Sequence, residues 1–171
     1  CTDKTGTLTE NKIVLQKYID AMGNENDDIL EYAYLNSYYS TGIKNLVDKA
    51  IISYADTHSL GDDIKKLEKV DEVPFDYTRR METVVVKEKN KYRVITKGAM
   101  EVVLKCCNKI KIGNKYLDID DKMKKVVNDK SVELASDGMQ VIALAEKVYD
   151  SKNMINDKFY EKDMVFVGFV G

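Results

Sequence analysis

The fold of this chain is decided by residues 75–99, which read FDYTRRMETVVVKEKNKYRVITKGA. Residues 81–86 and 92–96 within this stretch are dominated by side chains that favour strands. The segment between them, residues 87–91, is polar and predicts a turn. We therefore expect an antiparallel hairpin here, with Pro74 at the edge of a preceding strand and a helix starting at Met100.

Working outward from the hairpin, the pattern predicts elements of both kinds. Further strands are expected at 12–17, 69–75, 141–145 and 165–170, and a second hairpin at 109–117 around Gly113. Helices are expected from Asp27 (with Asn26 or Asp27 as cap), at 46–55, at 64–67, from 100 to 107 and at 123–135, with loops at 18–26 and 147–161. Because helices and hairpins mix without strict alternation, the predicted class is α+β, an antiparallel sheet of about six or seven strands flanked by helices.

Composition sets further bounds. The chain has 171 residues, 44% of them hydrophobic and 33% charged, with a net charge of −2. These values are ordinary for a soluble domain and argue against a nucleic-acid partner. Three cysteines make no disulfide framework and fit a reducing compartment.

No apolar run approaches about 18 residues, so no transmembrane helix is expected. The chain lacks an initiator Met and stops in an apolar, strand-like run, so we expect a soluble fragment excised from a larger protein.

A candidate for covalent chemistry lies at the start, where residues 3–9 read DKTGTLT. Asp3 can serve as a nucleophile that forms an acyl phosphate. Thr5 stands where a second carboxylate would hydrolyse that intermediate quickly, so an aspartyl-phosphate would be long-lived and suited to driving a conformational change. The alternative reading is a surface Asp in a turn.

Two segments favour nucleotide binding. Phe75 lies near Arg79 and Arg80, so an aromatic face for an adenine ring would accompany guanidinium groups for phosphates. Lys97 follows at a predicted strand end, beside Gly98, which lets a ligand approach the backbone. Taken alone, the segment around Phe75 also fits an aromatic core residue beside a solvated basic turn. The segment around Lys97 is too short to be specific by itself.

The three motifs together resemble the P-type ATPases in sequence and in order. The resemblance implies that Asp3 is the phosphorylated residue and that Asp3 and Thr5 help to hold Mg²⁺. It implies an ATP site in which Phe75 stacks on adenine and Arg80 contacts phosphate or sugar. Lys97 would then line the adenosine pocket and Gly98 would form its floor.

Two further positions follow from the same resemblance. Residues 137–145 read DGMQVIALA, and the family usually has Arg where this chain has Gln140, so Gln140 would contact ATP without a charge or leave the phosphates to Arg79 and Arg80. Near Asn45 the family often has a glutamate that binds the adenine amino group. The Asn45 side-chain carbonyl could replace it, or Asn45 could be a helix-surface amide.

Residues 36–50, NSYYSTGIKNLVDKA, resemble the corresponding segment of bacterial magnesium-importing P-type ATPases. The implied organisation is the end of the phosphorylation domain at 1–11 and a nucleotide-binding domain at 12–171. The implied setting is the cytoplasmic side of a plasma-membrane pump, with phosphorylation, actuator and transmembrane domains elsewhere in the chain. The fragment itself is then expected to bind ATP without turnover.

Other functions stay open at this point. Calcium- and proton-transporting pumps share the first three motifs. A haloacid-dehalogenase-type phosphatase also uses an aspartyl nucleophile, but it needs an acid at the position of Thr5. A nucleotide-sensing module would need Phe75 and not Asp3.

Overall fold

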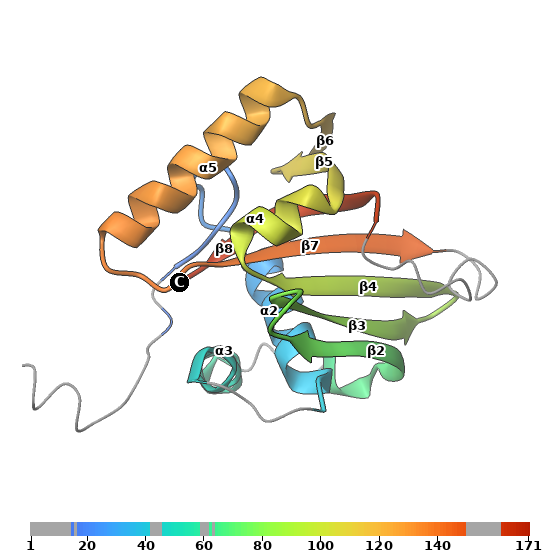
Figure 1. The fold of residues 1–171 in the computed structure, drawn as a ribbon. Coiled ribbons are helices and arrows are strands. Elements are labelled where there is room, and N and C mark those ends of the chain that lie inside the picture. Colours follow the sequence, from blue (N-terminus) through green and yellow to red (C-terminus); the bar gives the residue numbers. More distant parts are fainter. Residues whose placement is uncertain (1–14, 16, 42–45, 59–61, 63, 150–161) are drawn as a thin grey trace, which may run out of the picture.

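The fold is a single mixed sheet with helices on both faces (Figure 1). The computed structural model describes residues 15, 17–41, 46–58, 62, 64–149 and 162–171. These residues form an eight-stranded sheet in the order β2-β3-β4-β7-β8-β5-β6, with β1 paired to β8. The strands are β1 (Tyr18–Ile19), β2 (Glu68–Asp76), β3 (Met81–Glu88), β4 (Lys91–Gly98), β5 (Cys107–Ile112), β6 (Lys115–Asp118), β7 (Ile142–Tyr149) and β8 (Met164–Val170).

All pairs in this sheet are antiparallel except β5 with β8, which run parallel. The predicted α+β class with a mostly antiparallel sheet is confirmed. The main path of the sheet has seven strands, in agreement with the predicted number, and the short β1 adds another inside the segment 18–26, which we expected to be a loop.

The helices divide between the two faces of the sheet. The α2 (Asp27–Tyr39) and α3 (Leu46–Thr57) helices pack against one face, and α4 (Met100–Lys105) and α5 (Asp121–Ser136) against the other. A 3-10 turn covers Ile64–Lys66. Each face has its own hydrophobic core, because side chains alternate along a strand. In β3, Val84 and Val86 face α2 and α3, whereas Val85 faces α4 and α5.

Local signals set where the longer helices begin. The Asn26 side chain accepts a hydrogen bond from the Asp28 backbone N–H, so Asn26 is the N-cap of α2, one of the two residues that the sequence offers for this role. Asp120 caps α5 in the same way through the Met123 N–H. These caps satisfy backbone donors that the first helical turn leaves unpaired.

Several predicted boundaries are wrong. The turn between β3 and β4 is only Lys89–Asn90, because both strands extend to their tips. The helix expected to reach Cys107 ends at Lys105, since Cys107 already pairs with Met164 of β8. The loop expected from residue 147 begins later, because β7 continues to Tyr149 alongside β4.

The first and last described strands lie side by side. Beyond the β1–β8 pairing, the Lys17 N–H donates to the Gly171 carbonyl at 2.9 Å and the Gly171 N–H donates to the Lys17 carbonyl at 2.9 Å. Residues 12–14 and 16 of the predicted first strand lie outside the described residues, and Lys17 itself precedes β1.

Candidate nucleotide site

Four of the six predicted nucleotide-site residues lie on strands or turns at one end of the sheet. Since neighbouring strands are antiparallel, the end of β2, the start of β3, the end of β4 and the start of β7 all meet there. Phe75 is next to last in β2, and Lys97 and Gly98 close β4. Arg80 comes directly before β3.

Gln140 comes to the same end. It precedes β7 by two residues, and Ala143 of β7 is the partner of Gly98. The Gln140 side chain is exposed.

Lys97 is held in a buried cluster of charges. Its side chain is only 5% exposed, and the ammonium nitrogen lies 2.9 Å from a Glu82 carboxylate oxygen, 2.9 Å from the Ser37 hydroxyl oxygen, and against the Asp48 carboxylate. The Ser37 hydroxyl in turn donates to Asp48 at 2.9 Å. These three partners use the three donors of the Lys97 ammonium.

Sequence reasoning missed Ser37, Asp48 and Glu82. A signal for two of them was present in the patterning, because each interrupts an apolar series on one face of its element. Asp48 lies three residues before Ile51 and seven before Ala55 on the buried side of α3, and Glu82 alternates with Val84 on β3. A charge at such a position needs a buried partner.

Asn36 fixes α2 over this cluster. Its side-chain amide donates to the Ile95 carbonyl at 2.8 Å and to the Glu82 carbonyl at 3.2 Å, so it spans β4 and β3. The side chain is fully buried, and its own carbonyl oxygen accepts no hydrogen bond from the described residues.

The turn between β2 and β3 carries the aromatic and basic groups. Phe75 is 48% exposed. Arg79 holds the turn, because its guanidinium donates to the Pro74 carbonyl at 2.9 Å and to the Met81 carbonyl at 3.1 Å. Arg80 points outward instead and pairs with Glu101 of α4 at 2.7 Å. Hydrogen bonds from its own backbone N–H and from Arg80 hold the pKa of Glu101 below its usual value, although partial burial opposes the shift.

Gly98 sits where no side chain fits. A Cβ there would lie 2.5 Å from the Arg80 carbonyl oxygen and 2.5 Å from the Met81 Cβ. The neighbouring Ala99 N–H donates to the same Arg80 carbonyl at 3.1 Å. Arg80 itself has a positive φ of 59°. Non-glycine residues seldom adopt that conformation, so the close approach of Gly98 supports an unusual turn.

Glu72 ties the end of α2 to β2. It accepts from the Thr41 N–H at 3.0 Å, from the Thr41 hydroxyl at 2.5 Å and from the Lys69 ammonium at 2.7 Å. Burial raises the pKa of Glu72, but the hydrogen bonds from Lys69 and Thr41 outweigh it and the net pKa is lowered. Glu72 therefore stays ionised at neutral pH and holds Thr41, four residues before Asn45.

Three predicted site residues, Asp3, Thr5 and Asn45, lie outside the described residues. Within the part of the chain that is described, no group of three His, Cys, Asp or Glu side chains could hold a metal ion. Burial raises the pKa of the Cys107 thiol, so Cys107 does not supply a thiolate at neutral pH. None of the described helices is both long and apolar enough to cross a membrane.

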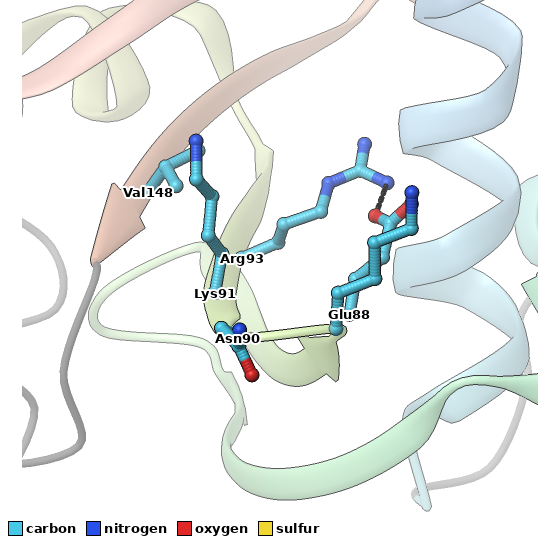
Figure 2. A pocket seen from close by; sticks show the side chains of 6 residues that line it. Glu88, Asn90, Lys91, Arg93 and Val148 are labelled. Carbon is cyan, nitrogen blue, oxygen red and sulfur yellow. Dashed lines mark hydrogen bonds and ion pairs between the residues drawn. The ribbon is translucent and has the colours of Figure 1, made fainter.

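A pocket of about 480 Å³ lies at the opposite end of the sheet (Figure 2). The β3–β4 hairpin and Val148 of β7 form it, and Arg93 crosses it to reach Glu88 at 2.9 Å. Its lining residues on β4, Lys91 and Arg93, lie roughly 14–20 Å along the strand from Lys97, and none of the predicted site residues lines it.

Residues 15–171 match the family model of the P-type ATPase cytoplasmic domain N. The chain therefore belongs to the P-type ATPases, as the motifs predict, and corresponds to this domain of them. It is 34% identical over 171 residues to magnesium-transporting ATPase, P-type 1, of Escherichia coli, covering 99% of this chain and 19% of that protein.

More distant relatives carry other names. A probable cation-transporting P-type ATPase of Mycoplasma genitalium is 31% identical over 178 residues, with 99% of this chain and 19% of that protein covered. Calcium-transporting ATPase 1 of Bacillus cereus is 27% identical over 190 residues, with 100% and 21% covered. The chain thus spans about a fifth of the length of the curated relatives it matches.

Proposed function

We propose that this chain binds ATP as the nucleotide-binding domain of a P-type cation pump. The observation that carries the proposal is the position of Phe75, Arg80, Lys97 and Gly98 at the same end of the sheet, in a chain of this family. Gln140 borders the same end, and Asn45 precedes α3, whose Asp48 contacts Lys97. These six residues form the proposed nucleotide site.

The charges of the site suggest how ATP is oriented. The ammonium of Lys97 is already compensated by Asp48 and Glu82, so it does not supply a free positive charge for phosphate. Arg80 is half exposed and shares its charge with one exposed carboxylate, so it is the better partner for phosphate oxygens.

In the whole pump, the γ-phosphate would be transferred to Asp3. A carboxylate oxygen of Asp3 attacks the γ-phosphorus, and the bond from that phosphorus to the bridging oxygen of ADP breaks. Mg²⁺ bound with ATP and near Asp3 and Thr5 would neutralise phosphate charge. We take residues 1–11 as the end of the phosphorylation domain and 12–171 as the nucleotide-binding domain, on the cytoplasmic side of the cell membrane, with the actuator and transmembrane domains elsewhere.

Replacing Phe75 by alanine should weaken ATP binding by about five- to 150-fold, because base–aromatic stacking contributes about 1–3 kcal/mol. The measurement is an NMR titration of the 171-residue chain with ATP. The matched control is Val148→Ala, since Val148 is also 48% exposed but lies at the other end of the sheet. Wild-type spectra that do not shift at Phe75 and Lys97 on addition of ATP would refute the proposed function.

We further propose that the pump imports magnesium, because residues 36–50 carry the string typical of that subfamily and a magnesium-transporting relative has 34% identity. The calcium-transporting relative, at 27%, makes calcium the alternative. Membership of the P-type family favours a pump over a phosphatase or a nucleotide sensor.

Expression of the full-length pump should restore growth at low magnesium to bacteria that lack their own magnesium uptake. The Asp3→Asn variant should not restore it, because the amide cannot form the acyl phosphate. Membrane insertion of both proteins is checked by immunoblot. Uptake of calcium and not magnesium by the wild-type pump, or growth with Asp3→Asn, would contradict this assignment.

A further inference from the structure

Tyr77 is a large aromatic side chain that the fold leaves outside. It is 90% exposed and sits in the turn between β2 and β3, two residues after Phe75. Its ring meets the Phe75 ring at a centroid distance of 5.4 Å and an interplanar angle of 87°. The two ring planes are therefore nearly perpendicular, and the space between them is open to a ligand.

The backbone that carries Tyr77 is fixed, although its ring is exposed. The Asp76 carboxylate accepts from the Thr78 N–H at 2.7 Å, and the Asp76 carbonyl accepts from the Arg80 N–H at 2.6 Å. Arg79 binds carbonyls on both sides of the turn. Because the backbone is already ordered, only the side-chain torsions of Tyr77 lose freedom when its ring contacts a ligand.

We propose that Tyr77 is a second aromatic contact for the nucleotide base. This inference rests on the proposed function, since it needs a base stacked on Phe75. A planar base that stacks on one of these two rings turns its edge toward the other ring, so both rings contact the base. Perpendicular aromatic contacts are favourable because the positive edge of one ring meets the negative face of the other.

Exposure argues for a ligand contact over a packing role. The Tyr77 ring buries almost nothing within the domain, so it adds little to the core. Phe75 beside it is also half exposed, and Arg80 three residues on carries the charge assigned to phosphate. Along this turn, the aromatic residues Phe75 and Tyr77 are followed by the cation Arg80. This order matches a nucleotide whose base contacts the two rings and whose phosphates lie near Arg80.

The test is calorimetric ATP titration of the 171-residue chain and its variants. Tyr77→Ala should weaken ATP binding about three- to tenfold, as expected for one aromatic contact. Tyr77→Phe keeps the ring and should stay within about twofold of wild type. The matched control is Tyr116→Ala, because Tyr116 is 53% exposed on β6 at the far edge of the sheet and should leave ATP binding unchanged.

Two readouts separate a base contact from a role in the turn. Intermolecular NOEs should join the adenine ring protons to the Tyr77 ring protons. Tyr77→Ala should also cost less in a Phe75→Leu background, because a base no longer stacked on Phe75 is no longer held against Tyr77.

The outcomes distinguish this inference from the proposed function. If the wild-type chain binds no ATP, the proposed function fails and the inference fails with it. If ATP binds and Phe75→Ala weakens it, but Tyr77→Ala does not, only the inference about Tyr77 is overturned. Absence of the NOEs in saturated samples overturns it as well.

Discussion

Replacing Lys97 by methionine is expected to lower the free energy of unfolding by about 3–5 kcal/mol, because removing one partner of a buried ion cluster leaves uncompensated charge in the interior. Lys97 is 5% exposed, and the Asp48 and Glu82 side chains that would lose their partner are 4% and 12% exposed. Urea denaturation followed by circular dichroism measures the effect.

Two comparisons sharpen this prediction. Lys109→Met breaks the Lys109–Asp118 pair, in which the side chains are 48% and 85% exposed. An exposed pair of this kind contributes little, so the urea midpoint should stay unchanged. The triple variant Lys97→Met, Asp48→Leu, Glu82→Leu removes all three charges and should recover much of the loss. A single Lys97→Met variant as stable as wild type would contradict the buried cluster.

Replacing Gly98 by alanine is expected to cost about 3 kcal/mol, the upper end for overpacking a tight site, and to weaken ATP binding as well. The added Cβ would overlap the Arg80 carbonyl and Met81, so β4 or the turn must move. The backbone shift also displaces Arg80, the proposed phosphate contact. Thermal unfolding and ATP titration of the same samples test both effects.

Gly113→Ala is the matched control for that variant. Gly113 has a positive φ of 61° but no atom within 4 Å of an added Cβ. Only backbone strain of about 1 kcal/mol is therefore expected there. Gly98→Ala should be the more damaging of the two. If both substitutions cost the same, steric exclusion does not explain Gly98.

Much of the fold was predictable because its signals are local. The cap at Asn26 sets the start of α2, and the alternation through Val84, Val85 and Val86 sets β3 in the central hairpin. The two-residue β1 was missed because its strand partner is β8, at the other end of the chain. No local pattern encodes such a distant pairing. The ends of α4 and β7 were misplaced for the same reason.

The site was predictable in part. Phe75, Arg80 and Lys97 were named from motifs, but their contacts were not, because Lys97 meets Asp48 across 49 residues of sequence and Ser37 across 60. Arg79 and Arg80 look alike in the sequence, and only the geometry of the turn shows that Arg79 binds backbone carbonyls while Arg80 faces outward.

The paired ends of the domain have a mechanical consequence. Lys17 and Gly171 are joined by two hydrogen bonds, so the first and last described segments are fixed side by side. Rotation about this pair of segments would move the whole described body as one unit. Phe75, on the edge strand β2, would then move farther than residues near β8, because three strands separate β2 from β8.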